Sequence, residues 1–178
     1  MAEATGKHSG RGRKLRSIAL NVAFFVAVFV AVSMFQSRNM LAAGGEAAPD
    51  LLGITLGGEV YRLSEAAGRP VLVYFFAPWC KVCAASADNL VRLRRWRDDD
   101  ELEILAVALD WQDAGEVRDY VERHGLNVNV VLGDATVAGA WRIQAFPSYY
   151  VLDSRHRVLR RDIGYSTQLG LWFRAWTI

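Results

Sequence analysis

The sequence predicts an α/β fold in which a central mixed sheet is flanked by helices, and three observations support this prediction. The run Val71–Phe76 is continuously apolar and rich in β-branched and aromatic residues, as expected for a central strand buried on both faces. Residues 84–97 lack Gly and Pro and space their apolar side chains along one helix face. The rest of the chain alternates strand and helix patterns, which indicates a mixed or largely parallel sheet with helices on both faces.

The later elements are located by capping residues and apolar spacing. Asp113 and Glu116 form a capping pair for a helix whose end is marked by Gly125. The other expected elements are strands at 103–109, 128–132, 148–152 and 158–163, a short helix after Asp134, a turn at 153–157, and an aromatic-rich closing segment at 169–176.

The first quarter of the chain predicts one N-terminal transmembrane helix. Residues 17–35 are almost continuously apolar and long enough to cross a bilayer as a helix. The basic tail 1–16 should stay in the cytoplasm by the positive-inside rule, which places everything after Phe35 outside. We therefore expect a single-pass membrane protein whose N-terminus is cytoplasmic and whose remaining chain is exported. Small residues at 42–44 suit a cleaved signal peptide as the alternative, although the apolar region is unusually long for one.

Composition fits one globular domain on a tether. Residues 36–48 are rich in Ala and Gly and predict a linker, and 49–178 has the size of an ordinary single domain. The formal net charge of the 178-residue chain is only +2, and its basic excess lies largely in the tail. Nothing in this pattern argues for nucleic-acid binding.

The two cysteines of the chain, Cys80 and Cys83, form a C-x-x-C pair just after the expected central strand. At the start of a helix, the free backbone N–H groups and the macrodipole stabilise a thiolate on the first Cys, and the second lies within bonding reach. We expect Cys80 to be the nucleophile and Cys83 the more buried, resolving thiol. An exported domain that uses both cysteines in one such pair is suited to dithiol–disulfide exchange.

Metal binding and a purely structural disulfide are the competing uses of this pair. A structural zinc site needs four ligands, and the chain adds only three histidines. His8 lies in the tail, His124 suits a helix end, and His156 lies in a polar turn. A disulfide that closes so short a loop constrains the unfolded chain very little. We therefore expect no metal and no cofactor.

The order of the elements and several sequence segments together resemble the thioredoxin fold, and more narrowly the membrane-anchored TlpA-like family that includes ResA, CcmG and ScsD. The resemblance spans about residues 49–165. The segments that carry it are Pro49-Asp50, 57–63, 68–70, 76–83 around the cysteines and 146–153 around Pro147. It implies a thiol–disulfide oxidoreductase that acts on protein thiols and disulfides, with a membrane electron donor of DsbD or CcdA type. It also implies a location in the bacterial inner membrane, with the catalytic domain in the periplasm.

The resemblance also implies supporting residues around the cysteines. Pro147 is expected to be cis and to lie against the pair, with the backbone beside it pairing with an extended substrate peptide. Phe146 replaces the smaller residue usual before that proline, and either narrows the substrate groove or adds apolar contact for a partner. Trp79 is expected to be exposed as a partner surface. Between the cysteines, Lys81 and Val82 set the redox poise, Lys81 either by favouring the thiolate or with little effect as a solvated residue.

Two acidic positions of related proteins carry other residues here. Tyr74 replaces the buried Asp of thioredoxin, and Ser86 replaces the Glu of ResA-like proteins. Water, the Ser86 hydroxyl or Asp110 would then have to move the proton of Cys83.

The expected activity is the reduction of disulfides in exported proteins. The same contacts serve the reverse reaction, so a DsbA-like thiol oxidant is one alternative. An alternative from another class is a Sco-like copper-binding protein, although such sites use C-x-x-x-C and a distant His.

Overall fold

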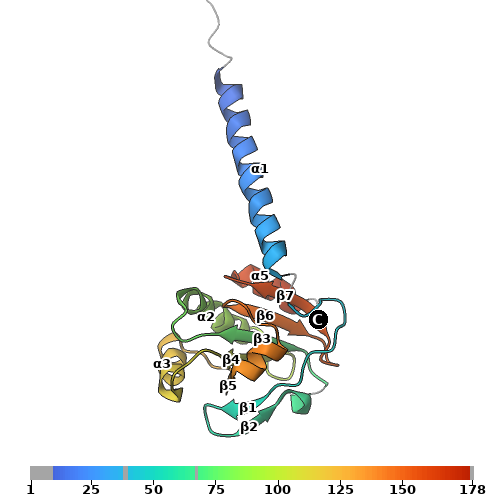
Figure 1. The fold of residues 1–178 in the computed structure, drawn as a ribbon, viewed down its shortest axis with the longest axis vertical. Helices are drawn as coiled ribbons and strands as arrows, with labels where there is room; N and C mark the ends of the chain where they lie inside the picture. The colour runs from blue at the N-terminus through green and yellow to red at the C-terminus, as the bar shows by residue number, and fades with distance from the viewer. Residues whose placement is uncertain (1–9, 38–39, 67, 177–178) are drawn as a thin grey trace, which may run out of the picture. The chain divides into compact units, whose positions relative to one another are not determined.

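The protein was analysed as a computed structural model that describes residues 10–37, 40–66 and 68–176 (Figure 1). The chain divides into two compact units, residues 1–38 and 39–178. The helix of the first unit is α1 (Gly10–Ser37), whose side chains are described at 16, 18–28 and 30–32. Among the residues so described, no helix is both long and apolar enough to cross a membrane. The expected tail 1–16 lies mostly outside the described residues.

The second unit is built on a mixed sheet that has seven strands within the described part of the chain (Figure 1). The strand order is β2-β1-β5-β4-β3-β6-β7, in which β3, β4 and β5 are parallel and every other neighbouring pair is antiparallel. The strands are β1 (Leu52–Thr55), β2 (Val60–Arg62), β3 (Val71–Phe76), β4 (Glu103–Ala108), β5 (Asn129–Leu132), β6 (Ser148–Leu152) and β7 (Val158–Ile163). The thioredoxin-like α/β class predicted from the sequence is confirmed.

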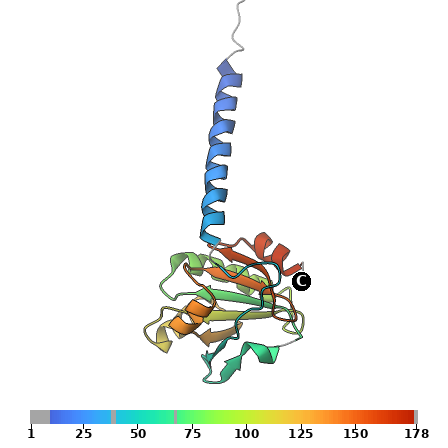
Figure 2. The same cartoon turned by 45° about the vertical axis from the view of Figure 1, so that its right-hand side comes forward.

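Helices cover both faces of this sheet, as the turned view also shows (Figure 2). They are α2 (Lys81–Arg94), α3 (Ala114–His124), α4 (Ala135–Ala140), α5 (Gln168–Trp176) and a short 3₁₀ helix, η1 (Leu63–Ala66). One core cluster joins the sheet to α2, α3 and α5 and includes both cysteines. A second cluster, which contains Trp141 after α4 and Leu63 of η1, fills the other face. Because β3 lies between the two clusters, all six of its residues are buried.

The helix boundaries follow the predicted caps. The Asp113 carboxylate accepts hydrogen bonds from the N–H groups of Gly115 and Glu116, at 2.7 and 3.2 Å. Gly125 ends α3 in the left-handed conformation, with φ 59°, which Gly adopts at little cost. Asp134 caps α4 through the N–H of Val137 at 2.9 Å. These side chains fix the helices that flank the site.

The second unit begins before Pro49, which corrects the predicted linker 36–48. Met40 and Leu41 are each 3% exposed and belong to the second core cluster. The Arg161 guanidinium donates to the carbonyl oxygens of Met40 and Leu41, at 2.7 Å each. The N–H of Leu41 also donates to the Tyr150 hydroxyl at 3.3 Å. Met40 and Leu41, which the sequence places in the predicted linker, therefore contribute to the core.

Candidate active site

Cys80 lies at the turn between β3 and α2 and forms the N-cap of that helix. Its backbone is extended, with φ −77° and ψ 109°, and its Sγ accepts a hydrogen bond from the N–H of Cys83 at 3.2 Å. A helix N-terminus leaves several N–H groups without intrahelical partners, and the sulfur satisfies one of them. Both thiols are free. The predicted positions of the two cysteines at the start of α2 are confirmed.

The two cysteines differ in access to solvent. Cys80 is 7% exposed, whereas Cys83 is completely buried in the core cluster that lies under α2. Burial raises the pKa of the Cys83 thiol well above its ordinary value, and its hydrogen bond with Cys80 raises this pKa further. Cys80 can therefore meet an incoming sulfur, whereas Cys83 is held protonated behind it.

Tyr74 of β3 forms the back wall of the pair. Its hydroxyl donates to the carbonyl oxygen of Cys83 at 3.1 Å. Its ring stacks on Phe76 with the ring centroids 5.5 Å apart. Burial raises the pKa of Tyr74 far above its ordinary value, so the hydroxyl remains a neutral hydrogen-bond donor. Tyr74, which stands where thioredoxin has a buried Asp, thus holds the backbone of α2 in place at Cys83.

The two side chains proposed to move the Cys83 proton, Ser86 and Asp110, already have hydrogen-bond partners. The Ser86 hydroxyl is buried and donates to the carbonyl oxygen of Val82 at 2.9 Å, within the same helix. Asp110 accepts a hydrogen bond from Trp79 through its carboxylate at 3.1 Å. We therefore assign the proton transfer to none of these side chains.

Trp79 forms the front of the site and is 62% exposed, as expected for a partner surface. Its indole N–H donates to both the carbonyl oxygen and the carboxylate of Asp110, at 3.1 Å each. Asp110 follows β4 and has φ 51°, a left-handed conformation that Asp tolerates better than most residues. The Trp79 ring also meets Phe146 edge to face, with the centroids 6.0 Å apart. The contact of Trp79 with Asp110 joins residues 31 positions apart, and no local sequence pattern indicates it.

The Phe146–Pro147 peptide bond is cis. Ser148 pairs with Phe75, so Pro147 lies at the end of the sheet from which β3 leads into Cys80. The carbonyl oxygen of Pro147 accepts a hydrogen bond from the N–H of Gly164 at 2.8 Å. Phe146 is partly buried and packs against both core clusters, one of which contains the cysteines.

Lys81 and Val82 occupy the exposed first turn of α2. Val82 is 45% exposed and adds an apolar surface beside Cys80. The histidines lie elsewhere: His124 ends α3, with its ring centroid 4.6 Å from that of Tyr120, and His156 occupies the β6–β7 turn. Within the described residues, no group of three or more His, Cys, Asp or Glu side chains is placed to hold a metal ion.

A groove of about 400 Å³ opens beside Asp110 and Phe146, the two residues that Trp79 contacts. It is lined by Leu109, Asp110, Trp111, Gly133, Asp134, Ala135, Ala138 and Phe146. At Gly133, a Cβ atom would lie 2.8 Å from Leu109 Cδ2 and 2.9 Å from Val107 Cγ1, so only glycine fits there without a shift. The groove combines an apolar floor with two carboxylates at the carboxyl ends of β4 and β5.

A dithiol at the start of the helix that follows the central strand, beside a cis-proline segment, defines a thioredoxin-like protein. The chain belongs to the AhpC/TSA family, whose model matches residues 44–161. This family is consistent with the TlpA-like resemblance seen in the sequence.

Two curated relatives and one solved structure illustrate the similarity. The chain is 27% identical over 141 residues to the thioredoxin-like protein YneN of Bacillus subtilis, covering 76% of this chain and 82% of YneN. It is 25% identical over 162 residues to the thiol-disulfide oxidoreductase ResA of Geobacillus kaustophilus, covering 88% and 92% of the two chains. A thiol:disulfide interchange protein of the thioredoxin family from Chlorobium tepidum superimposes with a TM-score of 0.67 at 20% identity, covering 77% and 98%.

Proposed function

We propose that this protein is a membrane-anchored thiol–disulfide oxidoreductase that reduces disulfides of exported proteins. The observation that carries the proposal is the asymmetry of the Cys80–Cys83 pair, in which the N-cap cysteine keeps a small exposure of 7% and the second cysteine has none. Such a pair separates the attacking thiol from the resolving thiol, as dithiol exchange requires. The name of the relative ResA, a thiol-disulfide oxidoreductase, agrees with this chemistry.

The first step is attack on a substrate disulfide. The Cys80 thiolate forms a bond to one substrate sulfur, the substrate S–S bond breaks, and the second substrate sulfur leaves as a thiolate. The negative charge on Cys80 is stabilised before attack by the N–H of Cys83, whose nitrogen lies 3.2 Å from the Cys80 sulfur.

The second step releases the substrate and oxidises the protein. Cys83 loses its proton and attacks Cys80 Sγ, the bond between Cys80 and the first substrate sulfur breaks, and the Cys80–Cys83 disulfide forms. The first substrate sulfur leaves as a thiolate and takes up a proton, which balances the proton that Cys83 lost. Two electrons have then passed from the pair to the substrate. We propose that a membrane dithiol donor of DsbD or CcdA type returns these two electrons and restores the free thiols.

The substrate lies against the front of the site. The carbonyl oxygens of Ala145 and Pro147 already accept hydrogen bonds, from Ser148 Oγ at 2.7 Å and from Gly164 N–H at 2.8 Å. We propose that an extended substrate pairs with the backbone of Phe146 between them, as an added strand. Side chains of that strand would enter the groove beside Asp110, whose carboxylate suits a basic or hydrogen-bond-donating group.

The membrane anchor is proposed from the sequence. The apolar run 17–35 lies within the range of lengths that cross a bilayer as a helix and follows a basic tail, which predicts a periplasmic catalytic domain. Several residues of this run, including Ser17 and Phe29, have side chains outside the described part of the structure. Flotation of the full chain with vesicles after an alkaline carbonate wash tests this assignment. Release of the chain by that wash would contradict it.

The reduction potential tests the direction of electron flow. We would equilibrate the full chain in detergent with glutathione and dithiothreitol buffers and follow tryptophan emission, using Cys83→Ser as the control that cannot form the internal disulfide. Reference proteins lie at about −270 mV for thioredoxin and about −120 mV for DsbA. A value near the first supports a reductase. A value near the second would overturn the proposed direction and indicate a thiol oxidant.

A further inference from the structure

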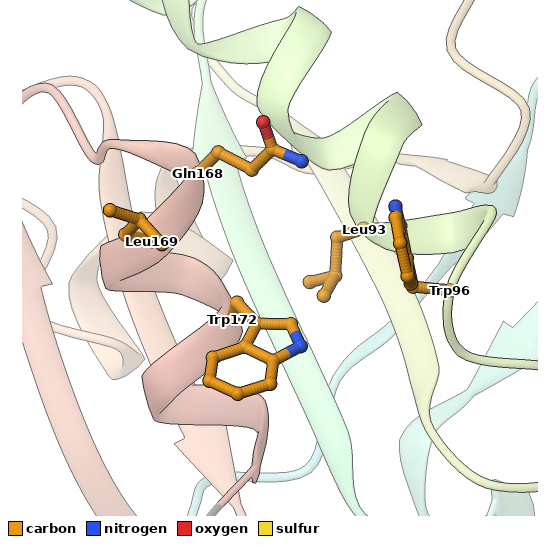
Figure 3. A pocket seen from close by; sticks show the side chains of 5 residues that line it. All are labelled: Leu93, Trp96, Gln168, Leu169 and Trp172. Atoms are coloured by element: carbon orange, nitrogen blue, oxygen red, sulfur yellow. The ribbon is translucent and has the colours of Figure 1, made fainter.

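An exposed apolar patch lies at the far end of α2 from the cysteines. It consists of Trp96, which follows α2, and Leu169, Trp172 and Phe173 of α5; we call these four residues the α2–α5 patch. Trp96 is 71%, Leu169 78% and Phe173 57% exposed. Figure 3 shows Leu93 and Trp96 facing Leu169 and Trp172 across a hollow of about 400 Å³. Large side chains clustered at the surface in this way indicate an interaction site.

Helix α5 is held in place, so the exposure of its outer face is a property of the fold. Leu171 is 1% exposed and belongs to the core cluster under α2. Asn89 of α2 donates to the carbonyl oxygen of Ser166 at 2.9 Å, just before α5 begins. The helix therefore has an inner face that packs on α2 and an outer face that carries the patch.

The chain enters the second unit against β7, the edge strand whose other face contacts this patch. Arg161 of β7 binds the carbonyl oxygens of Met40 and Leu41, and the neighbouring Arg160 places its guanidinium 5.6 Å from the ring centroid of Phe173. Met40 lies five positions after Phe35, where the apolar run ends. Fully extended, these five positions span at most about 18 Å. If residues 17–35 cross the bilayer, β7 and the patch beside it are tethered close to its surface.

The chemistry of the patch matches a lipid surface. Trp and Phe on one face of a short helix are typical of segments that lie at the boundary between headgroups and acyl chains. Acidic residues 98–101 follow Trp96, and two of them are paired, Asp99 with Arg94 at 2.7 Å and Glu101 with Arg97 at 3.3 Å. Because charges of both signs surround the patch, binding is expected to depend on apolar burial more than on anionic lipid.

We propose that the α2–α5 patch inserts into the headgroup layer of the membrane that holds the anchor. This inference rests on the anchor assigned in the proposed function. Helix α2 has 14 residues and rises by about 20 Å, so docking at its C-terminal end keeps the Cys80–Cys83 pair well above the lipid. The bilayer thus orients the dithiol toward partners in the aqueous compartment.

Quenching of tryptophan emission by brominated lipid tests the proposal. The full chain would be incorporated at one copy per nanodisc, in phosphatidylcholine or in the same lipid with dibrominated acyl chains. The predicted anchor contains no Trp, so quenching reports on the remainder of the chain. We expect emission to fall in the brominated disc, and the fall to shrink in Trp96→Phe/Trp172→Phe, in which Trp176 and the other tryptophans are retained.

A charge variant and its matched control give a second readout. Leu169→Asp should reduce the quenching, because it places a carboxylate in the patch. Val60→Asp alters an equally exposed apolar residue on β2, at the opposite edge of the sheet, and should leave the quenching unchanged. Disulfide-reductase activity of each variant confirms that it folds.

Three results would overturn the proposal. Equal emission in both discs would show that the patch does not touch lipid, although the anchor holds. A second contrary result is a blue shift of the patch tryptophans that appears only at two copies per disc, without quenching at one copy. It would show that the patch contacts a second copy of the chain instead of lipid. Failure of the chain to enter the disc or to float with vesicles would refute the anchor, and the membrane docking with it.

Discussion

The front and the back of the Cys80–Cys83 pair are built differently. The front is an exposed indole, Trp79, hydrogen-bonded to Asp110 and packed on Phe146. The back is the buried Tyr74, whose hydroxyl binds the Cys83 carbonyl. The exposed residues at the front can contact a partner, whereas the contacts of Tyr74 at the back hold Cys83 in the core. We therefore expect front substitutions to change partner recognition and back substitutions to change stability and the resolving step.

Substitutions of the two cysteines themselves should have the largest effects on activity, and the two effects should differ. Cys80→Ser is expected to lower disulfide-reductase activity by on the order of a thousandfold or more, because a hydroxyl is not ionised near neutral pH. Cys83→Ser should retain attack but accumulate the mixed disulfide. Insulin reduction and non-reducing gels with a disulfide-bonded substrate measure these outcomes. Full activity of Cys80→Ser would identify Cys83 as the attacking thiol and reverse the assignment.

The protonation of Cys83 should make stability depend on pH. Burial raises the pKa of this thiol, so the native form stays protonated where the unfolded thiol ionises, near about 8.5. Its contribution is complete below that pH, and the free energy of unfolding should fall by up to about 1.4 kcal/mol per pH unit above it. Urea unfolding of the reduced full chain between neutral pH and about 9.5 measures this slope.

The matched variants separate Cys83 from its neighbours. Cys83→Ala should flatten the decline, whereas Ser86→Ala, also buried in α2, should retain it. The pKa of Tyr74 is raised by burial too, but a free Tyr ionises near about 10, so its contribution is lost at higher pH. A decline of equal slope in Cys83→Ala would show that another group is responsible.

Tyr74→Phe tests the back wall without removing its ring. The variant loses the hydrogen bond to the Cys83 carbonyl but retains the stacking on Phe76. We expect a loss of about 1 kcal/mol in the free energy of unfolding, with little change in KM for a protein disulfide. Unchanged stability would mean that the hydroxyl contributes nothing to the position of α2.

Trp79→Phe should have the smallest effect on stability. It removes both hydrogen bonds to Asp110, which lie in an exposed region, and we expect a loss of less than about 1 kcal/mol. Its effect should appear as a higher KM for protein substrates. Asp110→Asn retains the backbone acceptor, one side-chain acceptor oxygen and the left-handed backbone but loses the charge, so it separates the hydrogen bonds of Trp79 from the proposed contact of the carboxylate with the substrate. A change in kcat alone would contradict a recognition role for Trp79.

The sequence predicts the centre of the fold well, because local patterns determine it. The buried run Val71–Phe76, the cysteines at the start of the next helix and the Asp113 and Asp134 caps all lie where expected. In each case the signal and the structure it predicts lie within a few residues of each other. Periodicity and capping chemistry are sufficient there.

The features that the sequence left out depend on contacts between distant residues. The partner of Trp79 lies 31 residues away, and the arginine that holds Met40 lies 121 residues away. The Ala- and Gly-rich context of Met40 and Leu41 resembles a spacer, and only the tertiary fold shows that these side chains enter the core. Likewise, the aromatic content of the closing segment predicts that it packs against something, but the sequence does not show which face is buried. The packing of α5 on α2 defines its inner and outer faces.

The hydrogen bonds from Arg161 to the carbonyl oxygens of Met40 and Leu41 determine where a soluble version of the protein can start. A truncation at Pro49 would delete two core side chains and leave Arg161 and the Tyr150 hydroxyl without these partners. A truncation at Asn39 would preserve them. The second unit therefore includes Met40 and Leu41, and the segment between it and the first unit is shorter than the predicted linker 36–48.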